Sequence, residues 1–140
     1  MPVNETVILV TESRTLAMGM SALLLSIPPI HHVAVAPDAT AFYDAIKEDK
    51  PLLILIDTAM FEHRLPEILH RARQLSPQSL YILLSDDTTE TRELADHAGI
   101  TVIMKGTDPR RLARILETLL SEHMADHPPA SNSAAAFISS

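Results

Sequence analysis

The sequence contains no cysteine and no tryptophan, and its first residues, MPVNETVILV, lack the basic region and the long apolar run of a signal peptide. Without cysteine the chain has neither a disulfide framework nor a thiolate site. No stretch approaches the ~20 apolar residues that a membrane-spanning helix needs. Together these absences indicate a soluble cytoplasmic protein that does not bind membranes, although the absence of cysteine also fits an extracellular protein.

Positive charge and aromatic side chains are also scarce. The formal net charge is -7, and the eleven basic residues are scattered along the chain instead of clustered. Aromatic residues make up only 4% of the sequence. A face that binds nucleic acid needs clustered Lys and Arg, and single strands are commonly bound by stacking on aromatic rings. We therefore expect no direct binding of nucleic acid.

What the sequence does have is enough apolar material for one domain. With 140 residues, of which 46% are hydrophobic and 21% charged, it fits a single globular domain with a proper core and leaves no room for a second one. Beyond His123 the composition shifts to Pro, Ala, Ser and Asn. We therefore expect a domain over residues 1–124 and a flexible tail or linker over residues 125–140.

Short apolar runs alternate with helical patterns along the whole domain. The five runs cover residues 6–10, 31–36, 52–56, 80–84 and 101–104. Continuous runs of this kind are typical of strands that are buried on both faces, whereas the segments between them carry the apolar stripe of amphipathic helices. The alternation predicts an α/β fold with a five-stranded, parallel, doubly wound sheet and helices on both faces.

Polar residues collect where the predicted strands end. A single carboxylate, Asp57, ends the central run, and other polar residues follow the first, fourth and fifth runs: Thr11, Glu12, Ser85, Asp86 and Lys105. Asp is also a common turn residue, so Asp57 alone decides little. Parallel strands, however, bring all these ends to one edge of the sheet, where open α/β sheets bind their ligands. We expect these side chains to converge there.

These residue types suit phosphoryl chemistry. A carboxylate can act as nucleophile toward a phosphoryl group if a hard divalent cation and a Lys neutralise the developing charge. Mg²⁺ typically takes one or two protein carboxylates and keeps several waters. Glu12 and Asp57, with a backbone carbonyl near Ala59, are therefore candidate ligands.

Over roughly residues 5 to 122 the arrangement resembles the receiver domain of two-component response regulators. In that family an acidic pair follows the first strand, the phosphoacceptor Asp ends the third, a Ser or Thr ends the fourth and a Lys ends the fifth. The matching positions are Thr11-Glu12, Asp57, Ser85 and Lys105. The resemblance implies a flavodoxin-like fold with strand order 2-1-3-4-5 and a receiver-like domain in residues 1–124.

The resemblance also implies a function. Asp57 is expected to be phosphorylated, in a Mg²⁺-dependent reaction, by a sensor histidine kinase or a phosphotransfer protein, so the domain is not itself an enzyme. The phosphorylated Asp57 would recruit the Ser85 hydroxyl while Lys105 pairs with the phosphoryl oxygens. This would shift the surface of the fourth helix, fifth strand and fifth helix between two states and so switch protein–protein interactions.

The chain departs from the family pattern at several positions. Thr11 stands at the first acidic position, so one metal carboxylate is missing, and Glu12 is one methylene longer than the usual Asp. The loop after Asp57 has neither the usual Pro nor the usual Gly, and Val102 stands where an aromatic switch residue is expected. A population shift needs contacts that differ between two states. We therefore expect weak Mg²⁺ binding and a defective aromatic switch.

Alternatives stay open beside this reading. A pseudo-receiver that acts as an interaction or homodimerisation module without phosphorylation is favoured by the missing acid and by surplus apolar residues on the first helix, Met18, Leu25 and Ala17. We expect that surplus to reflect a helix sunk deeply between its neighbours. A flavin-binding domain is suggested by the hydroxyl-rich segment 11–15, but this has no Gly, and Glu12 would repel a phosphate.

Overall fold

The structure is a computed structural model that describes residues 5–86 and 89–126. The strands are β1 (Thr6–Val10), β2 (His32–Ala36), β3 (Leu53–Asp57), β4 (Leu80–Ser85) and β5 (Thr101–Met104). The helices are α1 (Arg14–Leu25), α2 (Ala39–Asp49), α3 (Leu65–Leu75), α4 (Thr89–Ala98) and α5 (Pro109–Asp126). Two short 3₁₀ helices, η1 (Thr58–Met60) and η2 (Glu62–Arg64), lie between β3 and α3.

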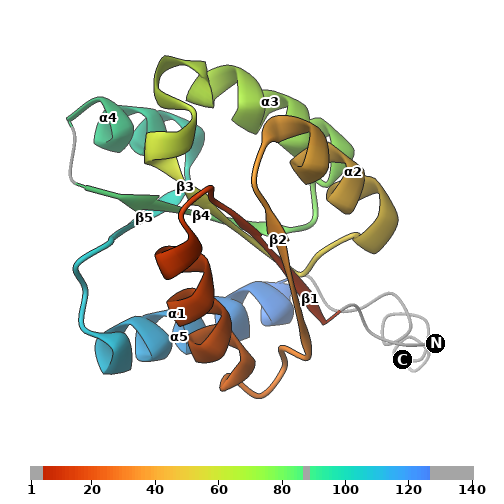
Figure 1. Cartoon of the computed structure of the whole chain (residues 1–140), viewed down its shortest axis with the longest axis vertical. Helices are drawn as coiled ribbons and strands as arrows, with labels where there is room; N and C mark the ends of the chain where they lie inside the picture. The colour runs from red at the N-terminus through yellow and green to blue at the C-terminus, as the bar shows by residue number, and fades with distance from the viewer. Residues whose placement is uncertain (1–4, 87–88, 127–140) are drawn as a thin grey trace.

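The chain forms a single parallel sheet with the order β2-β1-β3-β4-β5, which confirms the predicted fold class (Figure 1). Because all five strands point the same way, their carboxyl ends share one edge. The register there aligns Val10 with Ile56, Asp57 with Leu84 and Ser85 with Met104. The first, third, fourth and fifth strands therefore end at nearly the same level.

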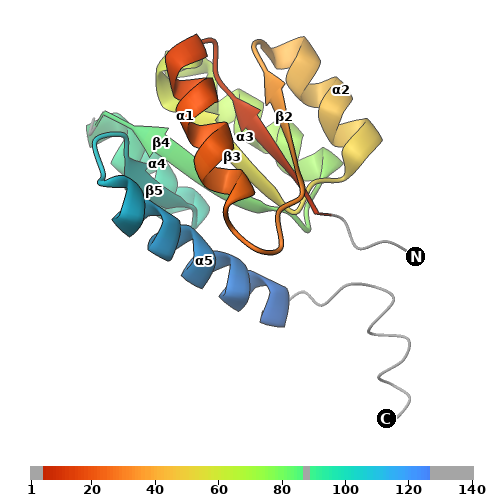
Figure 2. The same ribbon diagram turned by 60° about the horizontal axis from the view of Figure 1, so that its bottom comes forward.

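Helices cover both faces of the sheet, as expected (Figures 1 and 2). Helices α2, α3 and α4 share one core with Ile54 and Ile56 of β3, whereas α1 and α5 share the other core with Leu53 and Leu55. All four of these β3 side chains are fully buried. Burying one such side chain stabilises the fold by roughly 1.5–3 kcal/mol, so the central strand that carries Asp57 is firmly held.

Local signals in the sequence set the helix ends. The Asp38 carboxylate accepts a hydrogen bond from the Ala41 amide (2.8 Å) and caps α2, while Asp108 accepts from the amides of Arg110 and Arg111 and caps α5. Gly99 ends α4 with a φ of +71°, which a residue without Cβ adopts easily. These caps fix where α2 and α5 begin and where α4 ends.

The first helix is not sunk between its neighbours, so this expectation was wrong. Met20 and Leu24 of α1 are buried in the core, but Met18 is 73% exposed and Leu25 is 51% exposed. Apolar residues all around a helix are equally compatible with a buried helix and with an exposed apolar face. The helix has one buried face and one apolar face in contact with solvent.

Helix α5 is the last element of the described residues. Helix α5 continues to Asp126, past the domain boundary expected at residue 124, whereas most of the expected tail, from residue 127 onward, lies outside the described residues. None of the helices in residues 5–86 and 89–126 combines the length and the apolar character that a membrane-spanning segment needs.

One buried side chain ties β4 to the end of α3. The Tyr81 hydroxyl lies 2.8 Å from the carbonyl oxygens of both Ala72 and Ser76, to which it donates. These carbonyls belong to the last turn and the end of α3, where each also accepts from a backbone amide: Ala72 from Ser76 and Ser76 from Ser79. Burial raises the pKa of Tyr81, which keeps the hydroxyl protonated as a donor.

Replacing Tyr81 with Phe should therefore lower the free energy of unfolding by about 1 kcal/mol, because the hydrogen bonds from the hydroxyl to the Ala72 and Ser76 carbonyls are lost. Urea denaturation followed by circular dichroism measures this. The matched control is Tyr43→Phe: Tyr43 is only half-buried, and Phe keeps its ring contacts with Phe42 and Arg71. Equal stability losses in the two variants would contradict the capping role of Tyr81.

Candidate functional site

Asp57 ends β3 at the carboxyl edge of the sheet and caps the short helix η1. Its Oδ1 accepts a hydrogen bond from the Ala59 amide at 3.2 Å. The residue is only 5% exposed, because the neighbouring strands and the η1 turn enclose it. A carboxylate withdrawn from water to this extent needs both a cation and hydrogen-bond donors to offset its desolvation.

Lys105 supplies the cation. Its Nζ lies 2.5 Å from Asp57 Oδ1, and its side chain is 21% exposed. The Lys105 amide donates to the Ser85 carbonyl at 2.9 Å, which extends the β4–β5 ladder by one residue and places the lysine above the edge. From β5 the long side chain reaches across β4 to β3.

Thr11 supplies a hydrogen bond. Strand β1 lies next to β3, and the alignment of Val10 with Ile56 puts Thr11 beside Asp57. The buried Thr11 hydroxyl donates to Asp57 Oδ2 at 2.9 Å and accepts from the Ser13 amide at 3.1 Å. The sequence marks Thr11 only as a missing acid; the strand order, once known, is the signal that makes it a partner of Asp57.

The remaining predicted site residues lie close by in the fold but differ in exposure. Ser85 is fully buried at the end of β4, aligned with Met104 of β5. Glu12 is exposed on the turn between β1 and α1, next to Thr11. The structure thus joins Asp57 directly to Thr11 and Lys105, while the roles expected for Ser85 and Glu12 stay predictions.

Asp86, which follows Ser85 at the end of β4, is a second carboxylate beside Lys105. Its Oδ2 lies 3.6 Å from Lys105 Nζ, and its side chain is 69% exposed. Lys105 therefore lies between a buried carboxylate and an exposed one. The sequence places Asp86 with Ser85 among the polar residues at this edge, but it does not predict the contact with Lys105.

The oxygen donors here suit Mg²⁺ but are few. Across residues 5–86 and 89–126, no three His, Asp or Glu side chains are grouped so that they could hold a metal ion. Among the described residues Asp57 offers the one buried carboxylate, and Lys105 already lies against it. The Ala59 carbonyl lies two residues after Asp57, and the exposed Glu12 directly follows Thr11. These oxygen donors are of the hard type that Mg²⁺ prefers, which fits a weak site.

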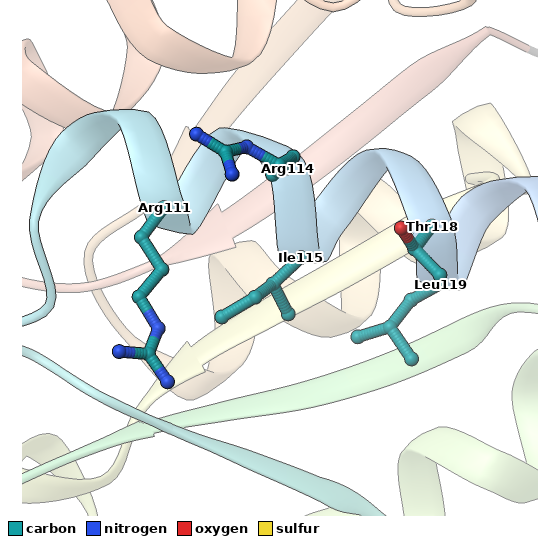
Figure 3. A pocket seen from close by; sticks show the side chains of 5 residues that line it. All are labelled: Arg111, Arg114, Ile115, Thr118 and Leu119. Carbon is teal, nitrogen blue, oxygen red and sulfur yellow. The ribbon is translucent and has the colours of Figure 1, made fainter.

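A hollow of about 300 Å³ on α5 is separate from these residues. It is lined by Arg111, Arg114, Ile115, Thr118 and Leu119, all of α5 (Figure 3). Ile115 and Leu119 form its apolar floor, and neither Asp57 nor any of its partners lines it. The chemistry-bearing residues lie at the sheet edge instead.

Replacing Lys105 with Met should destabilise the domain, because the largely buried Asp57 carboxylate then loses its cation. The expected loss of unfolding free energy is about 2 kcal/mol, between the values for exposed and for fully buried ion pairs. Chemical denaturation of the variant and the wild type measures it.

Two further variants make that experiment decisive. Adding Asp57→Asn to Lys105→Met removes the stranded charge, so the double variant should recover most of the lost stability. Lys47→Met on α2, where the side chain is exposed, should change stability by at most a few tenths of a kcal/mol. If Lys105→Met is as stable as Lys47→Met, the ion pair does not support the fold.

No protein-family model matches the chain, and no curated protein matches it either. Solved structures do. The response regulator receiver domain protein (CheY-like) from Methanospirillum hungatei superposes with a TM-score of 0.76 at 21% identity, covering 87% of this chain and 98% of its own.

Other receiver domains superpose similarly well. The signal receiver domain of a DNA-binding response regulator from Colwellia psychrerythraea gives a TM-score of 0.72 at 16% identity, over 83% of this chain and 98% of its own. The receiver domain of RcsB from Salmonella enterica, solved with the phosphomimetic BeF₃⁻, gives 0.73 at 17% identity, over 84% and 89%. The chain therefore has the fold of a response regulator receiver domain.

Proposed function

We propose that this chain is a receiver domain of two-component signalling that accepts a phosphoryl group on Asp57 from a histidine kinase or a phosphotransfer protein. The observation that carries the proposal is the contact of Asp57 with Lys105, at 2.5 Å, at the carboxyl edge of a sheet in the receiver order. A carboxylate nucleophile beside a fixed ammonium suits an anionic phosphoryl donor, because the ammonium offsets the charge that the acceptor and the donor bring together.

The transfer step follows from this arrangement. An oxygen of Asp57 forms a bond to phosphorus while the phosphorus–nitrogen bond of a phosphohistidine breaks, and the electron pair of that bond leaves with the imidazole. Asp57 becomes an acyl phosphate, and Lys105 stays within reach of the new phosphoryl oxygens. The domain supplies the acceptor, and the partner supplies the activated donor, so the domain is not an enzyme in its own right.

Magnesium enters this proposal as a weakly held ion. Glu12, Asp57 and the Ala59 carbonyl would hold it, and when bound it would neutralise charge on the transferred group. Thr11 cannot add a carboxylate, whatever its geometry. The chain's own share of charge neutralisation therefore rests on Lys105, whose ammonium contacts Asp57 Oδ1.

The expected output is a change in protein–protein contacts. Ser85, fully buried at the end of β4, is the hydroxyl that phosphorylated Asp57 would recruit, and the movement would pass to the surface of α4, β5 and α5. In this proposal the domain works in the cytoplasm and binds neither nucleic acid nor membranes. A partner kinase and a second copy of the chain are the partners that it would meet.

Incubation of the wild type with acetyl phosphate and Mg²⁺, followed by intact mass spectrometry, tests the proposal. We expect one added phosphoryl group on the wild type and none on Asp57→Ala. Asp38→Ala is the matched control, because Asp38 is an exposed carboxylate that only caps α2, and it should be labelled like the wild type. An unlabelled wild type, or equal labelling of Asp57→Ala, would reject the proposed function.

A second candidate is a pseudo-receiver that binds a partner or another copy of itself without phosphorylation. Specific observations favour it: the neutral Thr11 at the first acidic position, and the exposed Met18 and Leu25 on α1. Its signature is an assembly that is unchanged by Asp57→Ala and weakened by Met18→Glu. Light scattering after size-exclusion chromatography distinguishes the two candidates, since phosphorylation-dependent assembly would be lost in Asp57→Ala.

A further inference from the structure

We propose that Thr11 and Lys105 hold Asp57 in place without a metal ion, and that the identity of residue 11 sets the low affinity of this pocket for divalent cations. The inference rests on the same site as the proposed function and specifies how that site is regulated by metal. It concerns the resting pocket, before any phosphoryl group arrives.

Both carboxylate oxygens of Asp57 already have partners from the chain. Oδ1 faces the Lys105 ammonium at 2.5 Å and the Ala59 amide at 3.2 Å, and Oδ2 faces the Thr11 hydroxyl at 2.9 Å. Each partner is a donor, and one of them carries a full positive charge. The buried carboxylate is thereby neutralised and hydrogen-bonded, so the fold needs no cation at this point.

The direction of the Thr11 hydrogen bond is fixed by its surroundings. The Ser13 amide donates to Thr11 Oγ1 at 3.1 Å, so the hydroxyl hydrogen is left for Asp57 Oδ2. The residue is buried, and the β1–β3 register holds its backbone beside that of Asp57. Thr11 is therefore a positioning residue that orients the carboxylate.

A divalent cation would have to compete with this arrangement. To coordinate Asp57 it would approach an oxygen that already faces an ammonium, and within residues 5–86 and 89–126 it would find no second buried carboxylate to offset the repulsion from Lys105. The affinity of oxygen sites for hard cations depends on the number of charged ligands. The pocket has one such ligand in its interior, and Glu12 is exposed.

Changing Thr11 to Asp should remove the metal-free support of Asp57 and raise the affinity of the pocket for divalent cations. A carboxylate at position 11 would lie where the hydroxyl now lies within hydrogen-bond distance of Asp57, so two like charges would face each other in a buried site. Without metal this repulsion destabilises the fold. With Mg²⁺ the same two carboxylates become a ligand pair. The substitution converts a metal-insensitive fold into one that Mg²⁺ stabilises.

The experiment compares wild type, Thr11→Asp and the uncharged control Thr11→Asn, all in the full chain. The melting temperature is measured by circular dichroism in Mg²⁺ and in NaCl of equal ionic strength, and the affinity by calorimetric titration with Mg²⁺. We expect no Mg²⁺-dependent shift for wild type or Thr11→Asn. For Thr11→Asp we expect a lowered melting temperature that Mg²⁺ restores, and binding about tenfold tighter or more than that of the wild type.

Sub-millimolar Mg²⁺ binding by the wild type would overturn the inference. It would also be overturned if Thr11→Asn bound Mg²⁺ more tightly than the wild type and as tightly as Thr11→Asp. If Thr11→Asp does not fold without metal, recovery of its helical signal on adding Mg²⁺ is the same positive result. Failure of that signal to recover overturns the inference, and so does a wild type whose melting temperature depends on Mg²⁺. The readouts are metal binding and stability. A failure of phosphorylation would therefore reject the proposed function and leave this inference standing.

Discussion

The ion pair between Asp57 and Lys105, completed by the Thr11 hydroxyl, is the interaction on which this sheet edge depends. A carboxylate at the end of a fully buried strand is costly unless donors from both sides reach it. Those donors come from β1 and β5, which lie on opposite sides of β3 in the sheet. The strand order is thus an electrostatic requirement of the site as well as a packing solution.

Charge distinguishes this pocket from one built on several carboxylates. One buried carboxylate and one ammonium nearly cancel, and the exposed Asp86 gives Lys105 a second anion outside the pocket. A pocket of this composition is stable by itself, whereas a pocket rich in carboxylates stores repulsion that a cation must relieve. Metal dependence in such a fold is therefore a property of few side chains and not of the architecture.

The strands and the sheet edge that carries Asp57 were predictable from the sequence. The apolar runs located all the strands, since a buried parallel strand reads as a continuous run, and the single carboxylate after Ile56 marked the edge. The function of Thr11 was not predictable in the same way, because it depends on which strand lies next to β3. The exposed face of α1 was misjudged, because helical periodicity does not reveal whether a neighbour covers a given face.

Strand β5, which delivers Lys105, is also the outermost strand on its side and only four residues long. An outer strand leaves a row of backbone donors and acceptors unpaired, and such rows template the growth of intermolecular sheets. A strand this short presents few of these groups to a foreign chain. Lys105 can thus be held at the outer strand of the sheet while that strand offers little backbone for pairing with another chain.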